Sequence, residues 1–123
     1  MKKIPIIIFI IVSLAFASCD DIFLNDITGK SVNVICPSDS ATFSSASHVL
    51  FWWEALDGAD YYELQIVRPG FGNITELKLD KTLDSLKYTI SLPAGTYQWR
   101  IKGINSGYES KYLTRTIFIQ SGK

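Results

Sequence analysis

Residues 92–103 read LPAGTYQWRIKG, and this stretch carries the clearest indication of the fold. From Tyr97 onward, large apolar side chains recur at every second position, at Trp99 and Ile101. A period of two is typical of a strand with one face in a core, because adjacent strand residues point to opposite sides. The Pro and Gly just before Tyr97 predict a tight corner where the chain enters this strand.

Similar alternating segments lie before and after this strand, and no helical period of comparable length occurs from residue 31 on. Turn-forming residues separate the segments at the spacing of a sandwich. We therefore expect seven strands. Their residues are Val32, Val34 and Cys36; Val49, Phe51 and Trp53; Tyr62, Leu64 and Ile66; Thr75, Leu77 and Leu79; Leu86, Tyr88, Ile90 and Leu92; Tyr97, Trp99, Ile101 and Gly103; and a last segment between Tyr112 and Ile119.

The last strand leaves its inward phase open, since Leu113, Ile117 and Ile119 compete with Phe118. Alternation of loops between the two ends of an antiparallel sandwich places loops 56–60, 81–85 and 105–110 at the end where the chain enters. Loops 38–47, 68–73 and 93–95 are expected at the opposite end, together with the carboxyl terminus.

The positions of several of these residues resemble the fibronectin type III family. The resemblance rests on Trp53 late in the second strand, Tyr62 at the start of the third, and the corner from Leu92 to Tyr97 followed by Trp99. It covers residues 31–119 and implies an all-β, seven-stranded antiparallel sandwich of fibronectin type III or immunoglobulin-like type. In such sandwiches the corner tyrosine hydrogen-bonds to the backbone upstream, a role that would fall to Tyr97 here.

The amino terminus predicts export and lipidation. Lys2 and Lys3 precede an apolar run over residues 4–16, which is shorter than a membrane-spanning helix, and small residues then lead to Cys19. This arrangement resembles a bacterial lipoprotein signal. It implies cleavage after residue 18, acylation of Cys19, and a tether over residues 19–30 before a domain over residues 31–120. The alternative is an ordinary signal peptide cut near Ala17, which would leave Cys19 free to form a disulfide with Cys36.

Asp20 and Asp21 resemble the acidic surface-export signals of Bacteroidetes lipoproteins, so we expect a lipid anchor in the outer membrane and a domain at the cell surface. The periplasmic face and secretion are the alternatives. The motifs at residues 53–62 and 94–100 also resemble sandwich modules of Bacteroidetes surface lipoproteins, among them the amino-terminal domains of accessory starch-utilisation lipoproteins.

Composition argues against several classes of function. The 12 basic and 12 acidic residues balance, so no basic field favours nucleic acid. One His and two Cys leave little material for a metal cage or a histidine-based catalytic site, and we expect no cofactor, no metal and no enzyme activity. Asp57, Asp60 and Glu109 lack the close spacing of a calcium loop. Catalysis by Cys36 would need a nearby base, and His48 is expected at an exposed strand start.

Four aromatic residues are candidates for binding. Trp52 should point outward between the inward Phe51 and Trp53, where it would serve as a sugar-stacking platform or a protein contact unless another segment or subunit covers it. Phe71 lies between glycines at a loop tip, either as an anchor or as a plug over the sandwich end. Tyr108 lies in a loop at the other end. Tyr61 begins an outward polar face that comprises Tyr61, Glu63, Gln65, Glu76, Lys78, Gln98, Arg100 and Lys102; it could bind a glycan or be a solvated face.

Ser40 and Ser85 lie in short motifs that resemble the Bacteroidetes O-glycosylation sequence. Taken together, the sequence predicts a non-catalytic, lipid-anchored binding or assembly module of the envelope. One hypothesis is an accessory subunit that docks on an outer-membrane protein through Trp52 or Phe71, in a glycan-uptake complex for instance. The others are direct carbohydrate binding and a structural spacer or adhesion domain.

Overall fold

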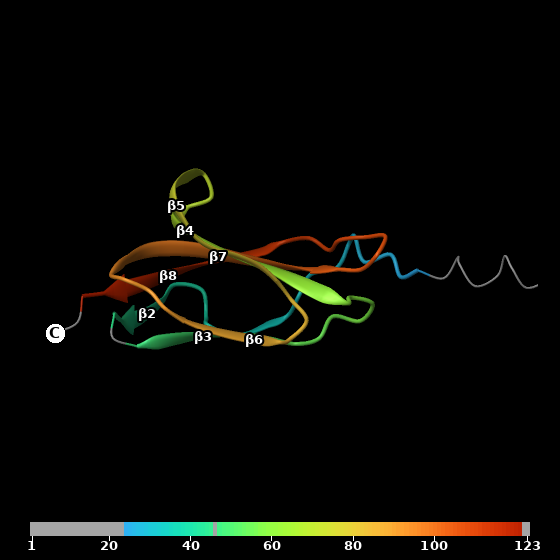
Figure 1. Cartoon of the computed structure of the whole chain (residues 1–123), viewed down its shortest axis with the longest axis horizontal. Helices are drawn as coiled ribbons and strands as arrows, with labels where there is room; N and C mark the ends of the chain where they lie inside the picture. The colour runs from blue at the N-terminus through green and yellow to red at the C-terminus, as the bar shows by residue number, and fades with distance from the viewer. Residues whose placement is uncertain (1–23, 46, 122–123) are drawn as a thin grey trace, which may run out of the picture.

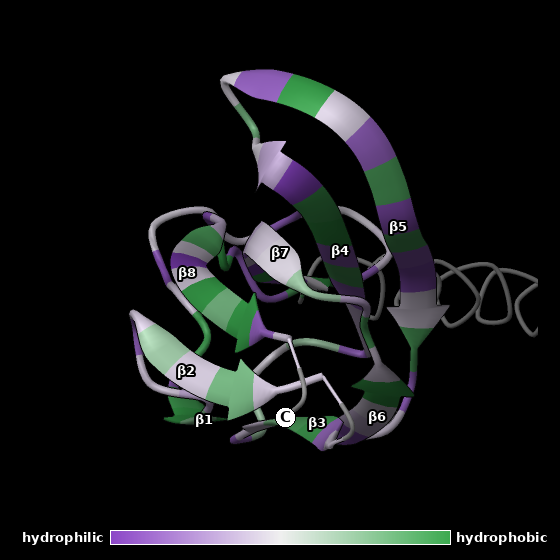
Figure 2. Ribbon diagram, turned by 90° about the vertical axis from the view of Figure 1, so that its left-hand side faces the viewer, coloured by the Kyte–Doolittle hydropathy of each residue, from purple (hydrophilic) through white to green (hydrophobic). Residues whose placement is uncertain are grey.

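The computed structural model describes residues 24–45 and 47–121, which form an all-β sandwich of two sheets. Figure 2 shows the two layers end on. No helix in this part of the chain is long and apolar enough to span a membrane. The expected signal peptide and Cys19 lie outside the described residues.

One sheet has the order β1 (Val34–Cys36), β3 (His48–Trp53), β6 (Lys87–Ser91). The other has the order β2 (Ala41–Ser44), β8 (Leu113–Gln120), β7 (Gly95–Ile104), β4 (Tyr61–Gly70), β5 (Asn73–Leu83).

The core lies between the sheets and is built from alternate residues of the central strands. Phe51 of β3 meets Trp99 of β7 edge to face, with ring centroids 4.9 Å apart, and Trp53 packs against Tyr62 at 5.8 Å. The inward rows expected for β3, β4 and β7 are all buried: Val49, Phe51, Trp53, Tyr62, Leu64, Ile66, Tyr97, Trp99 and Ile101. In β8, Ile117 and Ile119 are buried and Phe118 is 37% exposed, which settles the phase of that strand.

The corner before β7 closes one end of this core. The Tyr97 hydroxyl donates a 2.7 Å hydrogen bond to the carbonyl of Pro93, four residues upstream, and it accepts a 3.0 Å bond from Arg68 Nη1. Leu92 is buried beside the corner. Burial raises the pKa of Tyr97, although the nearby Arg68 acts in the opposite direction. The corner therefore ties the β6–β7 crossover to β4.

Residues 24–45 and 47–121 form eight strands, one more than the seven expected. The additional strand β2 lies inside the expected loop 38–47 and pairs in parallel with β8. Pro37 follows β1 and has no N–H to continue a ladder, so the chain leaves the three-stranded sheet there. The amide of Ser40 then donates to the carbonyl of Thr116, and Asp39 Oδ1 accepts from the amide of Thr116. The expected first strand and the expected loop after it thus contribute one strand to each sheet.

The β4–β5 hairpin is longer than expected. The predicted loop 68–73 shortens to a turn at Phe71 and Gly72, and the hairpin rises away from the sandwich on the outer side of its sheet (Figure 2). A register shift after Ile66 pairs Val67 with Leu77, which is 56% exposed. The shift reverses the alternation in β5.

Glu76 and Lys78 consequently do not belong to the expected outward polar face. Arg68, which shares the inward row of β4 with Ile66, binds Glu76 at 3.0 Å, and Glu76 in turn binds Lys78 at 3.0 Å. Glu76 and Lys78 lie on the side of Arg68 and Tyr97 because the bulge inserts one extra residue in β5, which strict alternation does not anticipate.

The segment expected to be a tether is packed against the domain from Leu24 on. Ile27 is fully buried, Lys30 closes a turn onto the carbonyl of Ile27, and the amide of Lys111 donates to the carbonyl of Lys30. Within the described part of the chain, residues 24–30 therefore pack on the sandwich. Figure 1 shows this segment at one end of the sandwich and the carboxyl terminus at the other. We call the end that holds residues 24–30 the N-terminal pole.

Candidate functional site

Two sheet faces and the N-terminal pole hold the residues that the sequence singled out. We call the outer side of β1, β3 and β6 the Trp52 face, and the outer side of β4, β7 and β8 the ladder face. The loop contacts at the pole are as expected, because Asn105 of one loop donates to the carbonyl of Gly58 in another. Phe71 lies on the ladder face, against Arg100, and Tyr108 lines a hollow at the pole.

The Trp52 face carries a row of apolar side chains that point away from the core. Ile35 of β1 and Leu50 of β3 are 43% and 36% exposed, and Trp52, also in β3, is partly exposed. Lys87 of β6 is the cross-strand partner of Trp52, and its ammonium lies 4.6 Å from the centroid of the indole ring. This contact covers one part of the indole and leaves Leu50 and Ile35 open beside it.

The ladder face carries cations stacked between aromatic rings. The Arg100 guanidinium lies 4.1 Å from the centroid of Phe71 and 4.0 Å from that of Tyr112, and Lys102 Nζ lies 4.6 Å from Tyr112. The amide of Phe71 also donates a 2.8 Å bond to Gln98 Oε1. Phe71 is therefore neither a free anchor nor a plug over the sandwich end. It is folded onto the outer side of β7.

The polar groups of the ladder face bind each other. Arg100 Nε donates to Gln65 Oε1 at 2.8 Å, the Tyr112 hydroxyl donates to Glu63, and Lys102 bridges Glu63 at 3.5 Å. Burial, followed by the bond to Glu63, raises the pKa of Tyr112.

Lys102 also binds Glu109 at 2.6 Å. Burial alone would lower the pKa of Lys102, but the bond to Glu109 and the charge of Glu63 outweigh it and raise that pKa. Tyr61, at the end of this face, is 49% exposed. Most of the polar groups that a sugar would need are thus already engaged with one another.

Asn105 joins three segments at the N-terminal pole. Its Nδ2 donates to the carbonyls of Asn25 and Gly58 at 2.8 and 3.0 Å, and its Oδ1 accepts from the amides of Gly107 and Tyr108. Gly58 has a φ of 95°, and a Cβ there would lie 2.8 Å from Asn25 Cβ, so only glycine fits this approach. One amide side chain therefore fixes the amino-terminal segment to two loops.

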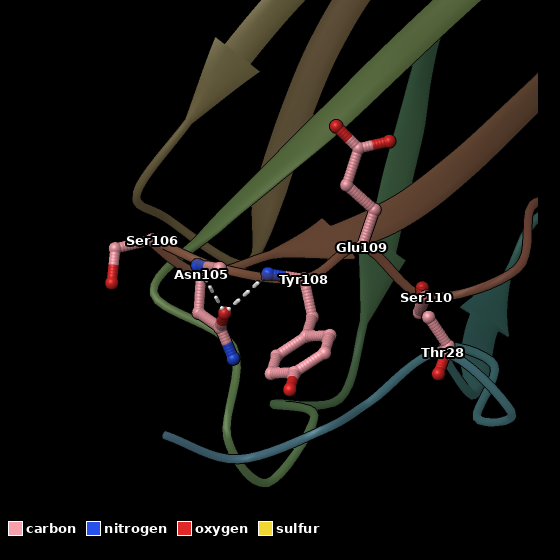
Figure 3. A pocket seen from close by; sticks show the side chains of 7 residues that line it. Thr28, Asn105, Ser106, Tyr108, Glu109 and Ser110 are labelled. Atoms are coloured by element: carbon pink, nitrogen blue, oxygen red, sulfur yellow. Dashed lines mark hydrogen bonds between the residues drawn. The ribbon is translucent and has the colours of Figure 1, made fainter. Parts of the chain in front are cut away.

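A shallow hollow lies beside this amide. Figure 3 shows the Tyr108 ring and the Asn105 side chain on one side of their loop, toward the amino-terminal segment, with Glu109 pointing away. Thr28 belongs to the same hollow, and its bonds to Asp26 lower the pKa of that carboxyl. The residues that line the hollow are Thr28, Asn105, Ser106, Gly107, Tyr108, Glu109 and Ser110.

The chemically reactive side chains are not brought together. The Cys36 thiol lies 3.5 Å from the carbonyl of Leu50, whereas His48 pairs with the Ser91 hydroxyl at 2.9 Å. Among residues 24–45 and 47–121, no group of three His, Cys, Asp or Glu side chains could hold a metal ion. Ser40 and Ser85 are both exposed; Ser40 has a φ of 68°, and Ser85 donates to the carbonyl of Lys87.

Sequence reasoning missed Asn105 and the partners of Arg100. Alternation placed Arg100 outward but gave no partner, because Phe71 and Tyr112 reach it from distant parts of the chain. Asn105 precedes a Ser-Gly pair, which indicates a turn, yet its bond to Asn25 spans 80 residues. Local patterns do not reveal contacts of this range.

Comparison with known proteins identifies the fold. No protein-family model matches the sequence. No curated protein matches it either. Among solved structures, the fibronectin(III)-like modules of CbhA from Clostridium thermocellum match with a TM-score of 0.56 and 10% identity, over 75% of this chain and 99% of theirs.

An Fn3-like protein from Clostridium thermocellum matches with a TM-score of 0.51 and 18% identity, over 78% of this chain and 96% of its own. The fibronectin type III domain of the human KIAA0970 protein matches with a TM-score of 0.55 and 12% identity, over 79% and 77%. These similarities show that the chain has the fold of a fibronectin type III domain.

Proposed function

We propose that this protein is a non-catalytic, lipid-anchored docking module of the bacterial envelope, and that it binds a protein of the same membrane through the Trp52 face. The fold fits a small binding or spacer domain. The observation that carries the proposal is the row formed by Ile35, Leu50 and Trp52. Apolar surface left outside a small core is a frequent mark of a protein contact, and tryptophan is over-represented at the centre of such contacts.

The contacts of the two expected anchors, Phe71 and Trp52, explain why the Trp52 face is preferred. Phe71, the other expected anchor, already packs against Arg100, and the polar groups around it bind each other. On the Trp52 face, Leu50 and Ile35 stay open. Lys87, beside the indole, favours a partner with a carboxylate next to its apolar surface.

The anchor restricts which partners can reach this face. The lipoprotein-type sequence before Cys19 supports acylation there, and Leu24 is only the fifth residue after Cys19. Five residues span at most about 18 Å, whereas the full expected tether would span about 40 Å. A domain held this closely presents its sheet faces sideways, toward proteins in the same membrane. A subunit of an outer-membrane glycan-uptake complex is the class of partner that the sequence resemblance suggests.

Intact mass of the protein from bacterial membranes tests the anchor. Acylation predicts a chain that begins at Cys19 and carries two or three acyl groups, with a single alkylatable thiol at Cys36. An unacylated chain without a free thiol would mean a disulfide between Cys19 and Cys36 and would overturn the lipid anchor.

Site-specific photocrosslinking in living cells tests the docking face. A photoreactive amino acid at Leu50 should give one discrete adduct with an envelope protein, and the adduct should be lost when Trp52→Thr is added. The matched control carries the same photoreactive group at Thr114 on the ladder face. Equal adducts at both positions, or an adduct that persists in Trp52→Thr, would contradict docking through this face.

A further inference from the structure

We infer that the N-terminal pole is itself a contact surface for the phospholipid headgroups of the membrane that holds the anchor. This inference rests on the proposed lipid anchor and names a second partner, a zwitterionic lipid surface. Three exposed residues carry it: Leu24, Tyr61 and Tyr108, which are 38%, 49% and 36% exposed.

These three residues belong to one rigid end of the molecule. A Cβ on Gly107, the neighbour of Tyr108, would lie 3.3 Å from the Leu24 side chain. Tyr61 pairs with Ile104 at the end of β7, and Ile104 forms an isolated bridge to Glu109. The bonds from Asn105 to Asn25 and Gly58 hold the segments in place. Little conformational entropy would therefore be lost when this end meets a surface.

The length of chain before Leu24 brings this end to the membrane. An acyl group on Cys19 would hold Leu24 within about 18 Å of its own attachment point. Attachment also makes the contact intramolecular, so that weak individual contacts suffice. Tyrosine suits this position because its ring is apolar and its hydroxyl can stay hydrated among headgroups.

The charges at the pole identify the kind of lipid surface. Asp26, Asp57 and Asp60 are exposed there, and Lys30 and Lys111 lie in the same region. This balance is slightly acidic and gives no attraction to anionic headgroups. Contact through two tyrosines and a leucine therefore fits zwitterionic lipids, and a higher fraction of anionic lipid should weaken it.

Paramagnetic broadening in nanodiscs tests the inference. The acylated full-length mature protein is placed in phosphatidylcholine nanodiscs that contain a nitroxide headgroup lipid, and backbone amide signals are recorded. The amides of Leu24, Tyr61 and Tyr108 should broaden several-fold more than those of Phe71 and Phe118. Replacing half of the phosphatidylcholine by phosphatidylglycerol should reduce this difference.

Matched variants test whether the broadening depends on the tyrosines of the N-terminal pole or follows from any loss of an exposed aromatic side chain. Tyr61→Ser combined with Tyr108→Ser should reduce the broadening of Leu24 by at least half, whereas Phe118→Ser, at a residue of equal exposure near the opposite end, should leave it unchanged. Unchanged chemical shifts in the core would show that each variant is folded. Uniform broadening, or the strongest broadening at Phe71, Phe118 or Trp52, would overturn the inference.

The same experiment distinguishes this inference from the proposed anchor. If the mass of the native protein shows no acyl group, a maleimide lipid is coupled to Cys19 in the Cys36→Ser variant, which supplies an anchor at the same residue. The broadening pattern then decides the role of the pole, and the native mass alone decides the natural anchor.

Discussion

The outer faces of the two sheets use similar residues in different ways. On the ladder face, Arg100 lies between Phe71 and Tyr112, and the neighbouring polar groups bind one another. On the Trp52 face, Lys87 covers part of one indole, while Leu50 and Ile35 remain exposed. The difference shows that an aromatic side chain on the outer side of a strand indicates a binding site only when other residues of the same chain do not already pack against it. Four experiments would break or sharpen this contrast.

The largest effect is expected for Arg100→Ala. This change removes both ring contacts and the bond to Gln65, and should lower the free energy of unfolding by about 2 kcal/mol. Its counterpart, Trp52→Thr, should cost about 1 kcal/mol or less, because Trp52 is partly exposed outside the core. Urea denaturation followed by tryptophan fluorescence measures both. Equal losses would show that the two faces contribute alike to stability.

Tyr112→Phe should have the next largest effect. The ring contacts with Arg100 and Lys102 stay, but the hydroxyl bond to Glu63 is lost, so stability should fall by about 1 kcal/mol. The same denaturation measurement applies, with Tyr108→Phe as the control on an exposed tyrosine. A loss as large as that of Arg100→Ala would mean that hydrogen bonding, and not stacking, holds the ladder face together.

Leu50→Thr should change stability by no more than about 0.5 kcal/mol, since its side chain points outward from a strand that threonine also favours. It should nevertheless weaken the photocrosslinked complex proposed for the Trp52 face. Thermal unfolding and adduct yield are compared in the same variant. A large drop in melting temperature would mean that Leu50 contributes to the packed core, which would contradict its role in the docking surface.

The smallest effect is expected from Glu76 on the hairpin that carries Phe71. Its bonds to Lys78 and then Arg68 hold the pKa of Glu76 below 4.5. A lowered pKa in the folded state contributes stability above the unfolded value, and that contribution disappears as the pH falls through the folded pKa. Glu76→Gln should therefore be slightly less stable than the natural protein at neutral pH, and the difference should vanish well below pH 4.5. Denaturation curves measured from pH 7 to pH 3 test this prediction. A stability difference between Glu76→Gln and the natural protein that persists in acid would contradict it.

The sequence predicted the central part of the fold well, because that part follows local rules. Alternation identified the buried rows of β3, β4 and β7, and the corner pattern located Tyr97 and its bond to Pro93. In these strands each residue faces either the core or the solvent, so a period of two in the sequence is enough to predict which residues are buried.

The rest depended on features that alternation cannot express. One inserted residue near Lys78 reversed the faces of β5, and β2 was hidden in a polar stretch whose pairing with β8 is nonlocal. The amino-terminal segment looked like a tether because, among residues 24–30, Ile27 alone is fully buried, and one buried apolar residue makes no periodic pattern. Among the candidate binding residues, Trp52 lies on the outer side as expected, while the contact of Phe71 with Arg100 needed the folded chain.

The placement of the neighbouring strands β1 and β2 in different sheets also has a mechanical consequence. β2 lies parallel to β8, near the carboxyl terminus, and residues on either side of β2 extend the bonding to Thr116 and Gln120. A pull between the amino-terminal segment and the carboxyl end, which lie at opposite ends of the sandwich (Figure 1), would act along these strands. The bonds between β2 and β8 would then be loaded together in shear and would have to break at nearly the same moment. A domain held at one end and drawn at the other would resist force there first, before its core is disturbed.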